Sequence, residues 1–553
     1  MKTIKTTIAT MLALPVIGVA MSSLSSCTEV DSSLVEYEED YYLNSPNDTV
    51  YSVAGILGKM QALGDRTVLL GELRGDLTVL TPEANSYLQE VADFNAPFGT
   101  NPYNQPKDYY AVIQNCNYFI AKADSLLEKR GEKVFEKELA AVHAFRAWTY
   151  FQLALNYGKV PFFTEPLLKE KDAYPDAQAW ADIDEICEFF IEDLKPYVDT
   201  KQPQYINGNS YLPVRLLLGD MCLWAGRYAD AAQYYHDFLN HRDQHHPLSV
   251  CSVRWDDVEF LRKSDSYSSA LLGEELAYIP MEEEEYDGVV SDLPDIFNST
   301  EENNYYCQAT YSEAYKLLSQ SQRYTMVYAD IETGLRDTIS PDTIQIQEEI
   351  SRGDLRLSVI YDIKASGISN INYSTIRQNY AKIFNSGIIL YRLAHVYLRY
   401  AEALNRAGFP QAAFAVLKYG LCNENNSKYI GEEERTRAGE LINFNPTYFL
   451  SSSTYGLHAR GCGNVEADTL YAIPACVTRE DSILAVEDLI MEESALETAG
   501  EGLRYYDLMR IALRRNKTEY LADKIALRKG KAKYDPDLYQ KLLNKENWYL
   551  PLP

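Results

Sequence analysis

The sequence predicts a mainly α-helical protein that is built on tetratricopeptide-like helical hairpins and carries a large loop-rich insertion with a few short strands. Three observations lead to this prediction. Two distant segments repeat the same residue spacing, a third segment has apolar residues at helical intervals, and residues 243–388 are rich in Tyr, Asn, Ser and Gly with weak periodicity. The first two features favour packed helices, and the last favours loops.

The two repeats share small residues where antiparallel helices approach each other and a glycine where the first helix ends. The first repeat has Leu218-Gly219, Cys222, Gly226, Ala231 and Tyr235, and the second has Tyr400-Ala401, Leu404, Gly408, Ala413 and Leu417 at identical offsets. Glycine ends a helix in a left-handed conformation without the steric penalty of a side chain. This spacing is typical of tetratricopeptide repeats, and it predicts hairpins near residues 211–242 and 389–421.

A third hairpin is predicted near residues 107–157. Apolar residues at helical spacing indicate helices over 107–127 and 135–156, and the second helix is expected to end at Gly158 and Pro161. No Pro-rich, Ser-rich or Gly-rich linker divides the rest of the chain. Residues 46–553 are therefore expected to form a single domain, with residues 243–388 as its insertion.

The N-terminal segment has the pattern of a lipoprotein export signal. Lys2 and Lys5 precede an apolar stretch over residues 8–21, which is shorter than the roughly 20 apolar residues that span a bilayer. The tetrapeptide Leu24-Ser25-Ser26-Cys27 then resembles a bacterial lipobox, in which cleavage precedes a lipid-bearing cysteine. Residues 1–26 are predicted to be the signal peptide, with lipid on Cys27. The alternative is ordinary cleavage, in which Cys27 has no special role.

The charge balance limits the possible partners. The chain has 52 Lys and Arg against 80 Asp and Glu, a formal net charge of −28. This excess of acid argues against nucleic acid or an anionic lipid surface as a partner, so membrane contact is expected through the lipid anchor only. Acidic residues crowd residues 27–45, which are predicted to form an extended tether.

Sequence motifs of catalysis and of metal binding are absent from the chain. There is no HExxH motif, nucleophile elbow, phosphate loop or calcium loop, so no enzyme activity, cofactor or metal is predicted. The carboxylates at residues 282–285 and the histidines at 236–246 are more typical of solvated surface than of a metal site. Cys116, Cys187 and Cys222 fall on helical patterns and are predicted to be core, while pairing among the other cysteines stays open.

Several segments, taken in order along the chain, resemble the motifs of one family. They are Glu72-Leu73-Arg74-Gly75-Asp76, Arg146-Ala147-Trp148-Thr149-Tyr150-Phe151 with Tyr157-Gly158 and Pro161, the helix from Tyr391 to Asn405, Glu501-Gly502-Leu503-Arg504 with Asp507-Leu508 and Arg510, and the end from Trp548 to Pro553. Together with the lipobox, these motifs are similar to those of the SusD/RagB outer-membrane lipoproteins of Bacteroidetes. His395 departs from the family pattern, which has an acid at that place.

The resemblance implies a location and a role as well as the helical fold. Proteins of this family are lipid-anchored on the outer face of the outer membrane, where they capture oligomeric nutrient and pass it to a SusC-like TonB-dependent transporter. Family members bind glycans or, in one branch, peptides, and family precedent favours an oligosaccharide here. A surface glycoside hydrolase is the less favoured alternative, because no motif fixes two carboxylates together.

The candidate ligand-binding residues come from aromatic loops. The chain has 44 tyrosines and only five tryptophans, and tyrosine in loops suits stacking on sugars or peptide backbone. The resemblance implies that the segment after Asp76 contributes to the site, and residues 94–103 combine aromatic rings with amides between Pro97 and Pro102. The predicted site residues are Arg74, Asp76, Phe98, Asn101, Tyr103, Tyr305 and Tyr306. The competing interpretation is that Phe98 and Tyr103 only hold their loop against the helices.

Overall fold

The computed structural model describes most of the chain after the predicted anchor. It covers residues 53–552 except 170–177, 204–207, 241–270, 285, 301–305, 330–332, 335, 347–348, 367–374, 384–386 and 453. The predicted signal peptide, Cys27 and the acidic tether therefore lie outside the described residues. Within them, helices dominate and the sheets are small, which confirms the predicted mainly α-helical class.

Three pairs of adjacent helices occupy the segments in which hairpins were predicted. The pairs are α5 (Pro106–Lys122) with α6 (Glu136–Tyr157), α8 (Val214–Trp224) with α9 (Tyr228–Asn240), and α15 (Leu393–Arg406) with α16 (Pro410–Lys418). Gly226 and Gly408 follow α8 and α15 at φ angles of +75° and +93°, where a side chain would be strained. A Cβ on Gly219 would lie 2.6 Å from the Tyr235 ring, so this repeat position must stay small.

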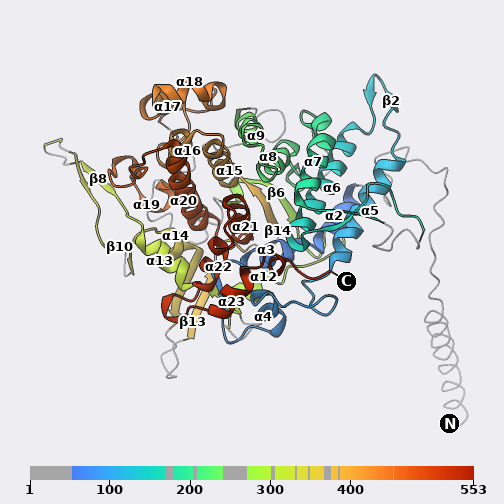
Figure 1. The fold of residues 1–553 in the computed structure, drawn as a ribbon, viewed down its shortest axis with the longest axis horizontal. Coiled ribbons are helices and arrows are strands. Elements are labelled where there is room, and N and C mark those ends of the chain that lie inside the picture. The colour runs from blue at the N-terminus through green and yellow to red at the C-terminus, as the bar shows by residue number, and fades with distance from the viewer. Residues whose placement is uncertain are drawn as a thin grey trace, which may run out of the picture.

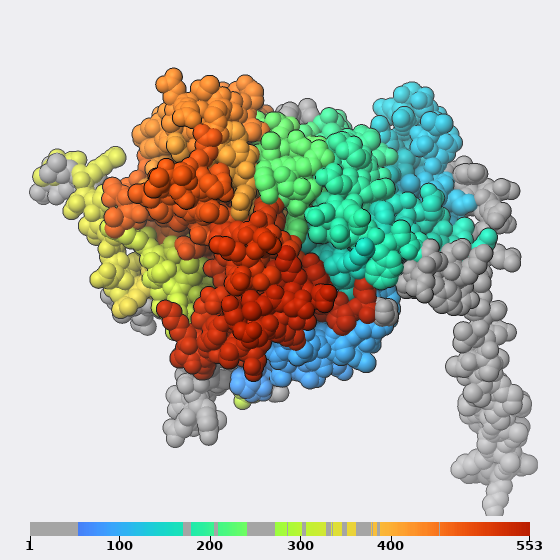
Figure 2. Space-filling view, in the orientation of Figure 1, coloured from blue at the N-terminus to red at the C-terminus, as the bar shows by residue number. Residues whose placement is uncertain are grey.

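The helices form one continuous row. Helix α7 (Ile183–Leu194) lies between α6 and α8, α9 packs on α15, and α20 (Arg479–Thr498) packs on both α15 and α16 (Figure 1). The C-terminal helices α21 (Arg504–Arg515), α22 (Thr518–Ala526) and α23 (Pro536–Leu542) then return along the row. Figure 2 shows this C-terminal segment, in red, filling the space between the first hairpins and the later part of the chain.

The remaining helices are short and lie mostly at the two ends of the row. They are α2 (Val53–Gln61), α3 (Gly64–Glu72), α4 (Ser86–Ala92), α12 (Leu293–Phe297), α13 (Glu313–Ser321), α14 (Arg356–Ile360), α17 (Asn423–Tyr429), α18 (Glu432–Ala438) and α19 (Ala459–Cys462). Three of them, α12, α13 and α14, belong to the insertion, for which only loops and strands were expected. Helix α13 forms because the Ser312 side chain caps it and Tyr315 buries its ring, a local signal that is too short to stand out in the sequence.

The described strands pair antiparallel in twos. They are β1 (Thr78–Leu80) with β7 (Ala309–Tyr311), β2 (Glu128–Lys129) with β3 (Glu132–Lys133), β4 (Val160–Phe162) with β5 (Ala179–Ala181), β6 (Glu275–Pro280) with β14 (Gly387–Arg392), β8 (Met326–Ala329) with β9 (Arg336–Ile339), β10 (Ile344–Ile346) with β11 (Glu349–Ser351), and β12 (Tyr361–Ser366) with β13 (Thr375–Tyr380). The β6–β14 pair brings residues 275–280 of the insertion beside the strand that leads directly into α15.

Two further observations concern the core and the helices. Cys116, Cys187 and Cys222 are buried free thiols, as their helical patterns predicted. Among the residues that the structure describes, every helix is too short or too polar to cross a bilayer.

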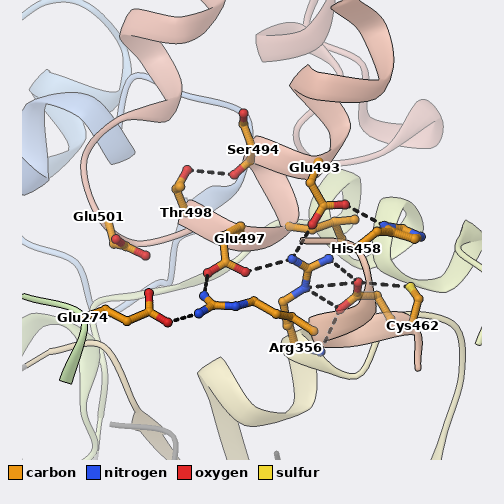
Figure 3. Close-up of polar contacts among 12 residues, drawn as sticks. Glu274, Arg356, His458, Cys462, Glu493, Ser494, Glu497, Thr498 and Glu501 are labelled. Atoms are coloured by element: carbon orange, nitrogen blue, oxygen red, sulfur yellow. Dashed lines mark hydrogen bonds and ion pairs between the residues drawn. The ribbon is translucent and has the colours of Figure 1, made fainter. Parts of the chain in front are cut away.

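A buried ion network fastens the insertion to α20. Three arginines from different elements donate to the Glu497 carboxylate: Arg356 of α14 at 2.9 Å, Arg392 at the end of β14 at 2.8 Å, and Arg460 of α19. Figure 3 shows the contact between Arg356 and Glu497. Burial opposes ionisation of Glu497, but the three guanidinium groups outweigh it and hold the pKa of this carboxyl well below its usual range. The charges are thus compensated inside the core rather than by water.

The network continues to the start of the C-terminal helices. Arg392 also donates to Glu501 at 2.7 Å, and the buried ammonium of Lys382 binds the same carboxylate. The His395 Nε2 lies 2.6 Å from the Glu501 Oε2, so the residue that departs from the family pattern joins this network. Burial, together with the nearby positive charges of Arg392 and Arg399, lowers the pKa of His395 to about 4. His395 is therefore neutral at pH 7.

Truncating the central carboxylate tests this network. Glu497→Ala should lower the free energy of unfolding by about 3–5 kcal/mol, because it leaves three buried guanidinium groups without their shared partner. Arg479→Ala at the exposed start of the same helix removes only the surface ion pair with Glu433 and should cost less than about 1 kcal/mol. Denaturant unfolding followed by circular dichroism measures the unfolding free energy of both variants. Equal losses in the two variants would contradict a central role of Glu497 in the network.

The His395 environment predicts a pH dependence of stability. The unfolded chain takes up a proton at this residue near pH 6.5, whereas the folded protein does so only near pH 4, so stability should fall as the pH is lowered through that window. The shifted pKa of His395 contributes about 3 kcal/mol to the pH dependence of the unfolding free energy, and His395→Gln should remove this contribution. The difference in unfolding free energy between wild type and variant should change between about pH 7 and pH 4 and stay flat above about pH 7.5. A difference that is constant over the whole range would refute the prediction.

Candidate functional site

Arg74 and Asp76 are buried in the interior, which corrects their prediction as ligand contacts. The Arg74 guanidinium donates to the Leu70 and Trp548 carbonyls at 2.7 and 3.2 Å. The Asp76 carboxylate accepts two bonds from Arg504, at 2.6 and 3.0 Å. Because both charges are satisfied by C-terminal residues, the ELRGD segment joins the two ends of the described chain rather than a ligand.

Asn101 is also buried, and it shapes the loop that the sequence predicted to be a binding surface. Its amide donates to the Tyr87 carbonyl at 3.0 Å and to Glu90 at 2.8 Å, and its side-chain oxygen accepts from the Tyr103 backbone N–H at 2.9 Å. Tyr103 is half-buried against the core. Asn101 is therefore corrected to a residue that holds the loop, while a role of Tyr103 in ligand binding stays a prediction.

Two predicted residues are accessible to a ligand. The side chains of Phe98 and Tyr306 are 43% and 55% exposed, whereas Tyr305 lies outside the described residues. Asn85 at the start of α4 bonds Gln308, and Asn101 bonds the Tyr87 carbonyl in the first turn of the same helix. The Phe98 loop and the Tyr306 segment are thus anchored to one helical turn, although they are about 200 residues apart in sequence.

Phe98 also lines an open cavity of about 450 Å³. Its aromatic walls are Phe98, Tyr110, Phe163 and Trp180. The chain end at Leu552 closes one side, and α5 lines another, which places the C-terminus beside the start of α5 (Figure 1). The volume is that of a small-molecule site.

The cavity has a rigid aromatic floor. The rings of Tyr110 and Phe163 stack at a centroid distance of 5.7 Å and an interplanar angle of 14°. The Tyr110 hydroxyl donates to the Pro161 carbonyl at 2.9 Å, and burial raises the pKa of this phenol far above its usual value. Pro161 pairs with Trp180 across the β4–β5 ladder, so backbone hydrogen bonds hold floor and wall together.

The polar side chains of the lining are few. They are Gln105, Lys107, Gln114 and Gln178. The Gln114 amide is bonded at both ends to the Leu167 backbone, at 2.9 and 3.0 Å, and the Gln105 amide donates to the Asn101 carbonyl. Lys107 is exposed and forms no ion pair with any residue in the described part of the chain. It is the single charged side chain in the described lining.

Trp180, which is 38% exposed at the cavity mouth, was not among the predicted site residues. The available signal was a tryptophan outside any helical pattern, in contrast to Trp148, which is buried in α6. Its partner strand β4 follows α6 directly, but nothing in the local sequence shows that β5 folds back onto it. The pairing that exposes the ring is therefore a tertiary feature.

One buried cluster has metal-ligating residue types. Ligand atoms of Asp354, His458 and Cys462 lie within 4.8 Å of one another. However, Arg356 donates to both Asp354 oxygens, at 3.0 and 2.6 Å, and His458 lies 2.6 Å from Glu493 (Figure 3). A guanidinium beside the carboxylate would repel a cation, and burial raises the pKa of the Cys462 thiol well above its usual range. We assign these residues to the ion network.

The other histidine and carboxylate groups from the sequence form no described site either. Glu282, Glu283 and Glu284 are exposed, and Glu285 lies outside the described residues, as do His241, His245 and His246. His236 is buried and bonded to the Asn443 carbonyl at 2.8 Å.

Comparisons with known proteins give one match to a family model. The model of the SusD family matches residues 367–553, which contain the Tyr391–Asn405 helix motif and the motif that begins at Glu501. No curated protein matches the sequence.

Solved structures share the fold at low sequence identity. A SusD superfamily protein from Bacteroides vulgatus is 14% identical with a TM-score of 0.57, and the match covers 93% of this chain and 96% of that one. A SusD superfamily protein from Bacteroides fragilis is 18% identical with a TM-score of 0.54, covering 93% and 96%. A SusD-like carbohydrate binding protein from Bacteroides vulgatus is 15% identical with a TM-score of 0.52, covering 82% of each chain.

The sequence match and the structural matches agree with each other. The family model covers the C-terminal helices, and the shared fold extends over nearly all of the described chain. Residues 367–553 match the SusD family model, and the chain shares its fold with SusD superfamily proteins.

Proposed function

We propose that this protein is a surface lipoprotein that binds oligosaccharide with the aromatic rings at its cavity mouth and delivers it to a TonB-dependent transporter of the outer membrane. The observation that carries the proposal is the pair of accessible rings, Phe98 and Trp180, at the edge of a cavity of about 450 Å³. Flat aromatic faces suit stacking on the apolar faces of sugar rings. The similarity in fold to a SusD-like carbohydrate binding protein supports the same ligand class.

The mouth is organised before a ligand arrives. Asn101 and Asn104 bond backbone groups on both sides of the Phe98 loop, and Trp180 is held by the β4–β5 ladder. A preformed site loses less conformational entropy when it binds. This rigidity supports a capture role, in which binding need not trigger a rearrangement.

The chemistry of the lining supports binding without catalysis. Glycoside hydrolysis requires two carboxyl groups that flank the scissile bond. The described lining of the cavity contains amides, apolar groups and one lysine, but no Asp or Glu. The hydrolase alternative is therefore disfavoured at this site, while a peptide ligand stays the alternative within the binding class.

The proposals of a lipid anchor and of a transporter partner are based on the sequence. The lipobox ending at Cys27 and the acidic residues 27–45 would place the folded part at a distance from the membrane surface. Such a placement suits a protein that takes up ligand from outside the cell and releases it to a barrel beside it.

Removing the two mouth rings tests ligand binding. The double variant Phe98→Ala, Trp180→Ala should weaken oligosaccharide binding roughly 30-fold, because each stacked ring contributes about 1 kcal/mol. A glycan and peptide array selects the ligand, and titration calorimetry measures the affinity. Tyr534→Ala, which removes an exposed ring outside the cavity, is the matched control and should bind like wild type. Unchanged affinity in the double variant, with an unchanged melting temperature, would place the site elsewhere.

Replacing the predicted lipid-bearing residue tests the location. Cys27→Ala should release the protein from the outer membrane into soluble fractions, because the variant lacks the thiol to which the lipid would be attached. Cell fractionation and protease accessibility on intact cells measure the distribution. Cys476→Ala, which removes a thiol near the surface, should remain anchored. A Cys27→Ala protein that stays membrane-bound with normal processing would contradict the lipobox.

A further inference from the structure

The interior of the cavity differs chemically from its mouth. Behind Phe98 and Trp180, the walls are the stacked rings of Tyr110 and Phe163, with Pro161 and Leu167 beside them. Leu552 adds an aliphatic surface from the chain end. A group that enters this space meets ring faces and hydrocarbon on several sides.

The interior has little free hydrogen-bonding capacity for a sugar. The Tyr110 hydroxyl is bonded to the Pro161 carbonyl, and both ends of the Gln114 amide are bonded to the Leu167 backbone. A sugar ring carries hydroxyl groups around its whole edge, and each one that is buried without a partner costs free energy. The interior is therefore a poor site for a bare sugar ring, whereas a flat apolar group loses nothing there.

We infer that the interior binds an aromatic acyl group that is esterified to the oligosaccharide, while the sugar to which it is attached stacks at the mouth. This inference rests on the proposed function, since it divides one ligand between mouth and interior. The stacked Tyr110 and Phe163 rings offer a flat surface for an aromatic ring.

Lys107 gives the cavity a charged hydrogen-bond donor that an ester could use. Lys107 is exposed, lines the cavity and has no ion-pair partner in the described chain, so its ammonium is available as a donor. An ester carbonyl lies between the sugar and the aromatic ring, where the mouth meets the interior. A hydrogen bond from Lys107 to this oxygen would favour an acylated sugar over both a bare sugar and a simple hydrocarbon.

The experiment uses a small probe that does not depend on knowing the glycan. Methyl ferulate carries the aromatic acyl ester alone, methyl β-xyloside carries a sugar ring alone, and N-acetyl-phenylalanine amide represents an aromatic group from a peptide. Titration calorimetry and saturation-transfer NMR on the full mature protein measure the affinity of each. Methyl ferulate should bind at least tenfold more tightly than either of the other two.

Two variants locate the binding. Leu167→Trp fills the interior and should lower methyl ferulate affinity at least tenfold, whereas Leu168→Trp places the same ring on the neighbouring residue, which does not line the cavity. Should Leu167→Trp fold poorly by circular dichroism, Leu552→Trp at the chain end fills the cavity from its other side.

The outcomes separate this inference from the proposed function. No binding of methyl ferulate, or binding that Leu167→Trp and Leu552→Trp leave unchanged, would overturn the inference, even where oligosaccharide binding still depends on Phe98 and Trp180. Equal or tighter binding of N-acetyl-phenylalanine amide would overturn it in favour of a peptide. Loss of methyl ferulate binding with an intact oligosaccharide affinity in Leu167→Trp would support the division between interior and mouth.

Discussion

The Glu497 carboxylate is the point on which the architecture depends, because it is shared by three arginines from three separate segments. Arg356 and Arg392 come from the insertion and its return strand, and Arg460 comes from the loop region before α20. Without this common acid, three buried cations would each lose a charged partner, which costs more than a hydrogen bond is worth. The network therefore fixes the position of the insertion on the helical row. Hydrophobic contact alone would discriminate less between alternative positions.

A second set of buried charges holds helix α21 to Asp76 in the N-terminal segment and to Glu402 in α15. Asp76 with Arg504, and Glu402 with Arg510, lie at distances of 2.6 to 3.0 Å, and Arg74 donates to the Trp548 carbonyl. Arginine suits these positions because its planar group binds a carboxylate through two parallel bonds. The charged motifs that resemble those of the SusD/RagB family thus hold the fold together, which fits the proposal that accessible aromatic residues bind the ligand.

The proposed site follows from this division of roles. The Phe98 loop is anchored by buried amides, and the Trp180 strand is anchored by a backbone ladder, so rings on two different elements face one cavity without being part of the core. An accessible ring on a rigid support can stack on a ligand without first leaving a packed position. The buried floor of Tyr110 and Phe163 then determines what fits behind the mouth.

The sequence by itself determined the helical class, the helices of the three hairpins and the resemblance to one family, because helix periodicity, turn glycines such as Gly226 and Gly408, and short motifs are local signals. It also picked out the Phe98 loop. It could not show that Arg74, Asp76 and Asn101 are buried, since a charged or amide residue reads the same in a loop whether its partner is water or a protein group. The partner of Asp76, for example, is Arg504, 428 residues away. It could not find Trp180 either. The exposure of that ring, the cavity and the pairing of the buried charges depend on which distant segments meet, and only the tertiary structure decides that.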